Sequence, residues 1–169
     1  MQVKLIVAIL TNNEDVRQQA IKKLEAIYGP ADFKGENHPF THSKYYNEEM
    51  GENLSRNLVS FEKLIQPTTL PEIKVQANKL EQELGQNGKR QVNIDPGYLD
   101  HNKVVLASTK EGGHRLLAAE KIYLDFTLYY NKGWQPLPWT YPDFKDKPFS
   151  QELEQIRKIF TIQLKQNSQ

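Results

Sequence analysis

The chain has 169 residues, of which 38% are hydrophobic and 25% charged, as is typical of one globular domain with a single core. Its 22 Lys and Arg and 21 Asp and Glu give a net charge of +1, which excludes the strongly basic surface used to bind nucleic acid or anionic membranes. The absence of cysteine excludes disulfides, thiolate nucleophiles and cysteine-containing zinc sites. We therefore expect a soluble, cytoplasmic protein with no membrane partner, and the sequence carries no strong signal for nucleic-acid binding.

The N-terminal part of the chain has the pattern of a strand followed by a helix. The apolar run at residues 5–10 is too short for a signal peptide or a membrane span and predicts a buried strand over residues 3–10. Thr11 and Glu14 form a capping pattern that predicts the start of a helix. Its apolar positions, Val16, Ala20, Leu24 and Ile27, have helical spacing, and Gly29-Pro30 ends it.

The middle of the chain predicts an irregular segment, a strand and a second helix. Residues 31–51 are rich in Gly, Pro and polar residues and indicate an irregular segment with one short strand, while residues 54–64 favour a strand. Thr69 and Glu72 repeat the capping pattern ahead of a second amphipathic helix, which ends at residues 85–88.

The second half of the chain is rich in strands. We predict strands at residues 90–94, 103–109, 114–118 and 121–130, an aromatic loop at 133–149, a helix at 150–164 and a disordered tail at 165–169. In the strand at 121–130, Ile122, Leu124, Phe126 and Leu128 are expected to face the core, and Tyr123, Asp125, Thr127 and Tyr129 the other side. The order of elements predicts a single α+β domain over residues 1–164, with a mixed or antiparallel sheet covered by helices. A ferredoxin-like core (β-α-β-β-α-β) with extra C-terminal strands and a helix is one arrangement that fits.

The tetrapeptide Asp95-Pro96-Gly97-Tyr98 is the first candidate for a functional site. Its residue types suit a tight turn after a strand. At a strand exit, Asn93, Asp95 and Tyr98 could also contact a ligand, with Asp95 as a general base, a metal ligand or an acceptor for a sugar hydroxyl. The local spacing does not choose among these roles.

Three other segments carry groups that could complete such a site. Tyr45 and Tyr46 precede Glu49, whose carboxylate could pair with Asp95 or could be a solvated surface group. A second segment has a hydroxyl, two cations and an imidazole within eight residues. These groups could bind an anion, or the segment could be an ordinary hairpin with solvated charges. The groups belong to Ser108, Lys110, His114 and Arg115. Trp139 lies between two prolines and either covers the core or forms a pocket wall.

Several well-defined motifs are missing from the sequence. It has no G-x-x-x-x-G-K-[ST] phosphate loop, no G-x-G-x-x-G and no H-E-x-x-H. His38 and His42 flank Pro39, which disfavours a helix, and in an extended chain the two imidazoles would lie roughly 13 Å apart. We therefore predict no metal site.

The segments singled out above, together with Pro39-Phe40, Ser60-Phe61-Glu62 and residues 136–143, resemble the uncharacterised prokaryotic family called domain of unknown function 4416. The resemblance extends from Val3 to about Leu164. Some members of that family carry the label of GTP-binding proteins. This sequence has no Asn-Lys-x-Asp guanine motif, since Asn78-Lys79-Leu80-Glu81 ends in Glu.

The sequence thus favours binding or turnover of a small polar ligand that bears a phosphate or a carboxylate. The predicted catalytic residues are Asp95, His114 and Glu49. The predicted ligand-binding residues are Asn93, Tyr98, Ser108, Lys110, Arg115, Tyr45, Tyr46 and Trp139. The alternative is a non-catalytic interaction module or homo-oligomer, and a third hypothesis is stacking of single-stranded RNA on exposed aromatic residues. Whether the protein is an enzyme, and which cofactor it uses, stay open at the level of sequence.

Overall fold

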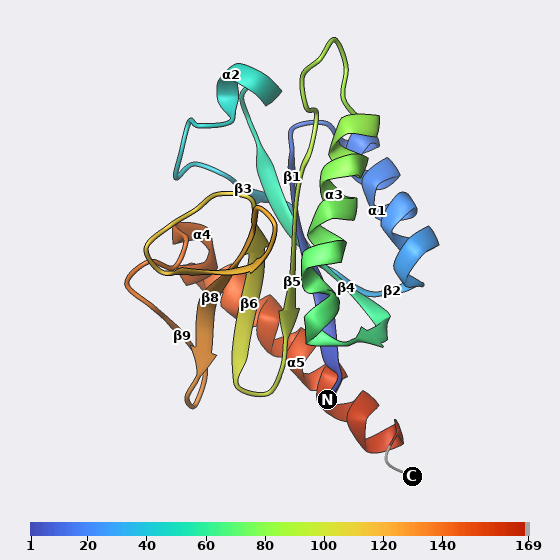
Figure 1. Cartoon of the computed structure of the whole chain (residues 1–169), viewed down its shortest axis with the longest axis vertical. Coiled ribbons are helices and arrows are strands. Elements are labelled where there is room, and N and C mark those ends of the chain that lie inside the picture. The colour runs from blue at the N-terminus through green and yellow to red at the C-terminus, as the bar shows by residue number, and fades with distance from the viewer. Residues whose placement is uncertain (168–169) are drawn as a thin grey trace.

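A nine-stranded antiparallel sheet forms the centre of the protein in a computed structural model that describes residues 1–167 (Figure 1). The main strand order is β2-β4-β1-β5-β6-β8-β7, with β3 paired to β4 and β9 paired to β8. The strands are β1 (Val3–Thr11), β2 (Ala31–Lys34), β3 (His38–Pro39), β4 (Ser55–Ile65), β5 (Asn93–Leu99), β6 (Lys103–Ser108), β7 (Arg115–Ala119), β8 (Ile122–Tyr130) and β9 (Trp134–Pro136). The predicted α+β class with an antiparallel sheet is confirmed.

Three long helices cover the sheet, and two short ones lie in the connections. They are α1 (Glu14–Tyr28), α2 (Asn47–Met50), α3 (Leu70–Glu83), α4 (Pro142–Lys145) and α5 (Lys147–Asn167). The predicted helices α1, α3 and α5 are therefore present. Helix α5 is longer than predicted, because residues 165–167, expected in a disordered tail, continue the helix. Residues 168–169 of that expected tail lie outside the described part of the chain.

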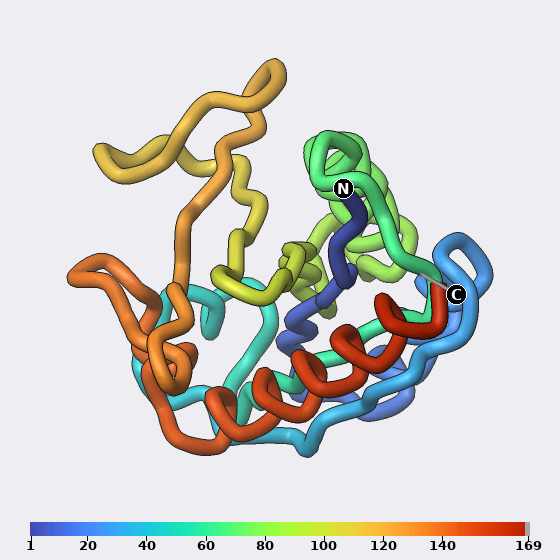
Figure 2. The backbone as a smooth tube through the Cα atoms, turned by 90° about the horizontal axis from the view of Figure 1, so that it is seen from below, coloured from blue at the N-terminus to red at the C-terminus, as the bar shows by residue number. Residues whose placement is uncertain are grey.

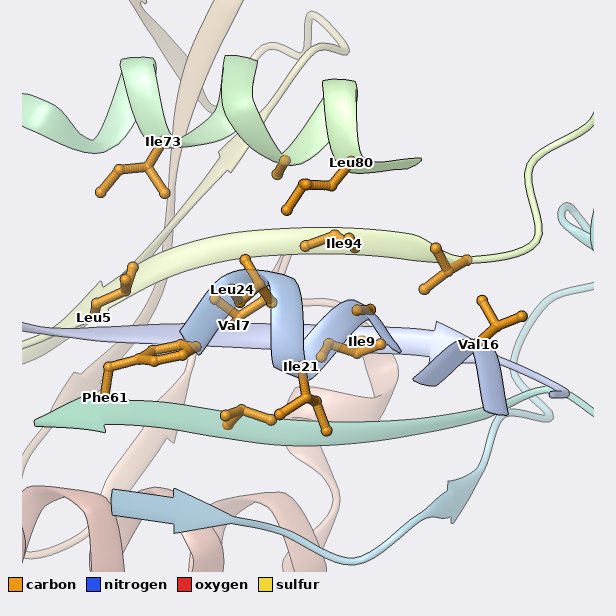
Figure 3. Close-up of a cluster of buried hydrophobic side chains, with 14 residues drawn as sticks. Leu5, Val7, Ile9, Val16, Ile21, Leu24, Phe61, Ile73, Leu80 and Ile94 are labelled. Carbon is orange, nitrogen blue, oxygen red and sulfur yellow. The ribbon is translucent and has the colours of Figure 1, made fainter. Parts of the chain in front are cut away.

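Strand β1 is buried along its whole length because helices pack on both faces of the sheet. Leu5, Val7 and Ile9 contact the cluster formed by α1 and α3 (Figure 3). The alternate residues Ile6 and Ala8 belong to a second cluster, which includes the apolar side chains of α5. Because successive side chains of a strand point to opposite faces, α1 and α3 cover one face and α5 covers the other.

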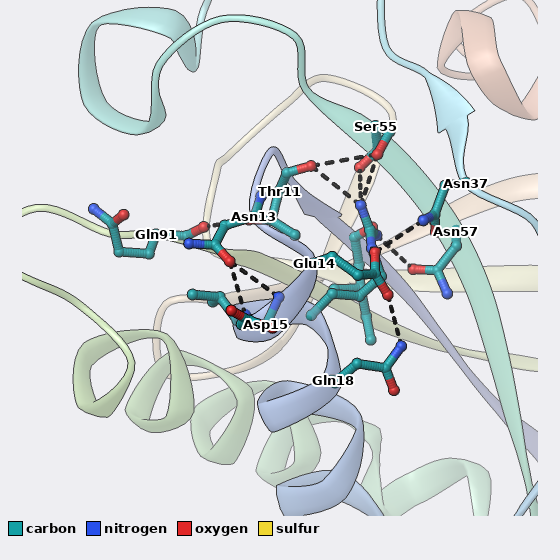
Figure 4. A network of polar contacts seen from close by, with 12 residues as sticks. Thr11, Asn13, Glu14, Asp15, Gln18, Asn37, Ser55, Asn57 and Gln91 are labelled. Carbon is teal, nitrogen blue, oxygen red and sulfur yellow. Dashed lines mark hydrogen bonds and ion pairs between the residues drawn. The ribbon is translucent and has the colours of Figure 1, made fainter.

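The start of α1 differs from the predicted capping pattern. Thr11 is the last residue of β1, and Asn13 is the cap, its side chain accepting from the backbone N–H groups of Asp15 and Val16 (Figure 4). Helix α3 also lacks the predicted cap, since Thr69 makes no side-chain cap bond and ends a 3₁₀ turn instead. Both predicted helices are present. At α1 the predicted capping residue is wrong, whereas at α3 Thr69 occupies the predicted position without making the predicted side-chain bond.

Arg17 joins α1 to β1 and β4. It is 2% exposed, and its guanidinium donates to Ile9 O, Thr11 O, Asn57 Oδ1 and Ser55. Since a buried charge is costly unless it is fully hydrogen-bonded, this network makes Arg17 a structural residue at the sheet end next to α1.

The segment Asp95-Pro96-Gly97-Tyr98 belongs to β5 and is not the predicted turn. It pairs with β1 from Leu5 to Ala8. Gly97 is required by close contact, because a Cβ atom there would lie 2.5 Å from Val105 O and 2.6 Å from Leu106 Cδ2 of β6. Pairing with β6 starts only at Gly97, so the missing N–H of Pro96 costs no bond to β6. Glycine and proline thus serve a strand here, although together they are typical of a turn.

Strand β8 does not keep the predicted alternation. Asp125 and Thr127 are buried, whereas Phe126 is 41% exposed. The register explains this, because Val104 and Val105 are opposite Leu128 and Phe126, which leaves Thr127 as an extra residue. Of the face of β8 expected to point away from the core, Asp125 and Thr127 are therefore turned inward, whereas Tyr129 stays exposed.

The hairpin of β7 and the start of β8 projects from the body of the protein (Figure 2). Within residues 1–167, no helix has the length and apolar character needed to cross a membrane.

Candidate functional site

The central feature of the candidate site is a cleft between β5 and β6. These strands pair only where Gly97–Leu99 meets residues 104–106. Before Gly97, β5 pairs only with β1, and beyond Leu106, β6 pairs only with β8. The sheet is therefore split at this end, and a cleft of about 400 Å³ opens there.

Two charged side chains of α3 hydrogen-bond to the backbone of β5 where β5 does not pair with β6. Glu81 Oε1 accepts from Ile94 N at 2.6 Å, and Lys74 Nζ donates to Ile94 O at 2.9 Å. Both side chains are buried and line the cleft. A strand edge without partners would leave backbone groups unsatisfied, so Lys74 and Glu81 substitute for the missing neighbour.

Asp95 lies in the cleft among positive charges. Its carboxylate accepts from Lys74 Nζ at 3.2 Å and Asn93 Nδ2 at 2.7 Å, and Arg56 lies 3.6 Å away. Burial by itself would raise the pKa of Asp95, but Lys74 and Arg56 together hold the pKa below its usual range. The carboxylate is therefore ionised at neutral pH and a weak base.

Metal binding by Asp95 would need neighbouring ligands. Among residues 1–167 there is no group of three or more His, Cys, Asp or Glu placed to hold a metal ion. The amide and cations described above occupy both oxygens of Asp95.

Arg56 forms the inner end of the cleft. It is 4% exposed, Nη1 donates to Asp143 Oδ2 at 2.5 Å, and the guanidinium lies 4.8 Å from the ring centre of Phe40 and 5.7 Å from that of Tyr141. Burial lowers the pKa of Arg56, but Asp143 and Asp95 more than offset this, so the pKa is raised. Within the described part of the chain its buried Nε has no hydrogen-bond partner.

Arg90 also faces the cleft, but its donors are already used. Glu49 accepts from Nε at 2.9 Å and from Nη2 at 2.7 Å, while Nη1 donates to Glu81 and Asn93. The hydrogen bonds from Arg90 lower the pKa of Glu49. Glu49 itself does not line the cleft, so it acts on the site through Arg90.

Lys110 lies just after the end of β6, and Arg115 is the first residue of β7. Arg115 Nε donates to Asp125 Oδ2 at 2.9 Å, and Nη1 donates to Ser108 Oγ at 3.1 Å and Lys110 O at 2.9 Å. The Lys110 ammonium lies 3.6 Å from the ring centre of Tyr45. No carboxylate of residues 1–167 pairs with this ammonium.

The remaining predicted residues lie outside the lining of the cleft. His114 Nε2 lies 3.2 Å from Asp125 Oδ2, and its ring stacks on Trp139 with centres 5.4 Å apart. Trp139 Nε1 donates to Phe126 O. Tyr98 is buried in an apolar cluster with Leu70 and Val105. Tyr45 contacts two lining residues, Lys110 and Tyr46, and its ring centre lies 4.9 Å from that of Tyr46.

The structure thus brings together six of the predicted residues in one cleft: Tyr46, Asn93, Asp95, Ser108, Lys110 and Arg115. Sequence reasoning missed further charged and polar lining residues: Arg56, Lys74, Asn78, Glu81, Gln82, Arg90, Thr109, Asp125, Thr127 and Tyr141. One sequence signal could have indicated some of these residues, namely a charged residue within an apolar pattern, as for Arg56 in β4 and Lys74 beside Ile73.

Comparison with known proteins gives the family of the chain. No curated protein and no solved structure matches it. The model of one family, described as Domain of unknown function (DUF4416), matches residues 1–160. The match covers the whole sheet and about two thirds of α5, and the chain belongs to this DUF4416 family.

Proposed function

We propose that the cleft between β5 and β6 binds a small polar ligand through a phosphate or carboxylate group. Five cationic side chains line the cleft against three carboxylates. Most of these cations are already neutralised within the protein. The observation that carries the proposal is that the ammonium of Lys110, which lines the cleft, pairs with no carboxylate in the part of the chain described. Such a donor suits an anion, because hydrogen bonds to charged groups are the strong ones.

The other walls support a small organic ligand. A cleft of about 400 Å³ falls within the usual range for such ligands, roughly 300–1,000 Å³. Tyr46, Tyr141 and Phe144 supply apolar surface. The low pKa of Asp95 favours binding over base catalysis by this residue, since its ionised carboxylate positions Lys74 and Arg56.

The test is calorimetric titration of inorganic phosphate into the protein at low ionic strength. Lys110→Ala should weaken binding by about 10- to 150-fold, because a hydrogen bond to a charged group contributes roughly 1.5–3 kcal/mol. Lys158→Ala, at an exposed position of α5, is the control and should bind as the wild type does. No binding of phosphate or acetate by the wild type, or equal loss in both variants, would contradict the proposal.

We also propose that β1, α1, β2, β4, α3 and β5 form a ferredoxin-like core. The order β2-β4-β1-β5, antiparallel throughout, supports this wiring. The placement of α1 and α3 on one face supports it as well. Strands β6 to β9 and α5 would then be additions, and the cleft would lie at the junction between core and addition.

A second candidate function is self-association through the edge strand β7. Leu116 is 75% exposed and Leu117 67% exposed on this strand at the end of the sheet, and an unprotected edge can pair with another strand. Light scattering should then give twice the mass of one chain, and Leu117→Lys should restore the monomer. A monomeric wild type at high concentration would exclude this candidate.

A further inference from the structure

Helix α3 turns a polar stripe toward the cleft. Lys74, Asn78 and Gln82 follow one another at intervals of four residues, and Glu81 lies beside them. Side chains at this spacing share one face of a helix. The stripe is therefore one wall of the cleft.

The members of the stripe differ in how far their hydrogen-bonding groups are used. Lys74 and Glu81 bind the backbone of Ile94, and they also contact Asp95 and Arg90. The side-chain amides of Asn78 and Gln82 make no hydrogen bond to any residue among 1–167. Each amide offers two N–H donors and one carbonyl acceptor without carrying a charge.

The donors that remain available for an anion belong to a different part of the cleft. Lys110, which pairs with no carboxylate, follows β6, and Arg115, of which only Nη2 makes no hydrogen bond to residues 1–167, begins β7. Asn78 and Gln82 come from the helix that packs on β5. An ammonium or guanidinium group only donates hydrogen bonds, whereas an amide both donates and accepts, so it matches the hydroxyl and amide groups of a ligand. The cleft is thus chemically asymmetric.

From this asymmetry, and on the basis of the proposed function, we infer the ligand class. The ligand is an organic molecule with hydroxyl or amide groups joined to one phosphate or carboxylate. Asn78 and Gln82 bind the hydroxyl or amide part, while Lys110 and Arg115 bind the anion. Asn78 and Gln82 are accordingly residues that determine specificity.

The experiment compares ligands that share an anion but differ in the attached body. One pair is methyl phosphate and ribose 5-phosphate, and the other is acetate and N-acetylglycine. By calorimetry, the larger member of at least one pair should bind the wild type about tenfold more tightly, as expected for two neutral hydrogen bonds. The pair that shows this gain distinguishes a hydroxyl-bearing from an amide-bearing ligand.

Variants of α3 then test whether its side chains cause this gain in affinity. Asn78→Leu and Gln82→Met should each remove most of the gain and leave the affinity for methyl phosphate or acetate unchanged. Gln76→Met, on the same helix but outside the cleft lining, is the matched control and should keep the gain.

The outcomes distinguish the inferred ligand class from the proposed anion site. Binding of simple anions without any gain for the larger ligands overturns the inference and leaves the anion site intact. A gain that persists in Asn78→Leu and Gln82→Met overturns the inference as well. If none of the four compounds binds, the proposed function fails and the inference fails with it.

Discussion

Lys74 and Glu81 are buried charges whose primary role is to satisfy the backbone of Ile94. Asp95 then serves as the counter-ion that holds Lys74 and Arg56 in the cleft. Removing one partner of a buried ion pair is costly, because the other charge is left unpaired. The cations are therefore held in fixed positions before any ligand arrives, which favours tight binding.

Asp95→Asn tests this role through the pH dependence of stability. The folded protein holds the pKa of Asp95 below its ordinary value of 3.8. The carboxylate therefore stabilises the fold fully above about pH 4, and this contribution is lost as the pH falls through the lower folded pKa. In urea unfolding, Asp95→Asn should be less stable than the wild type at pH 7, with the difference shrinking below pH 4.

Glu111→Gln is the control for this experiment, since Glu111 is an exposed residue between β6 and β7. Its stability should follow that of the wild type at every pH. A difference between Asp95→Asn and the wild type that stays constant from pH 7 to pH 3 would show that the carboxylate charge is not what stabilises the site.

The residues of the site were only partly predictable. Lys110 and Arg115 lie in a short polar segment, where hydroxyls and cations gather within a few residues of each other. Arg56 and Lys74 lie within regular elements, where an isolated charge is usually solvated. Only the splitting of β5 from β6, which depends on contacts distant in sequence, brings these two residues into the cleft.

At the scale of elements, β5 determines where the sheet opens. Gly97 lets β6 approach closely, while residues before it contact β1 and α3 but not β6. A change at Gly97 should therefore affect the one place where the two strands are joined.

Gly97→Ala should destabilise the protein by about 1–3 kcal/mol, the usual cost of overpacking. The added methyl group would meet the carbonyl of Val105, which is backbone and cannot move aside easily. Gly113→Ala is the control, because a Cβ atom there has no neighbour within 4 Å, and it should change stability by less than about 0.5 kcal/mol. Equal effects in urea unfolding would refute the close-approach explanation.

Hydrophobic periodicity was sufficient to predict α1, α3 and α5 and most strands. It failed where long-range contacts decide the local structure. The pair Pro96-Gly97 is typical of a turn, yet it fits a strand whose neighbour begins at Gly97. In β8 the extra residue Thr127 changes which side chains are buried, and a simple alternation cannot reveal such a bulge.

At the scale of the whole molecule, the site belongs to several distant parts of the chain. Arg56 comes from β4, Lys74 from α3, Asp95 from β5, and Lys110 and Arg115 from β6 to β7. All of them lie within the part matched by the family model. The cleft is thus a property of the complete fold, and no single segment of the chain contains it.

The most direct test of the central claim is an NMR titration of the ¹⁵N-labelled protein with inorganic phosphate. We predict saturable shifts of the backbone amides at residues 93–95 and 107–115, around the cleft, and none in β2 or the last turns of α5. The absence of saturable shifts, or shifts confined to elements away from β5 and β6, would contradict the assignment of an anion site to this cleft.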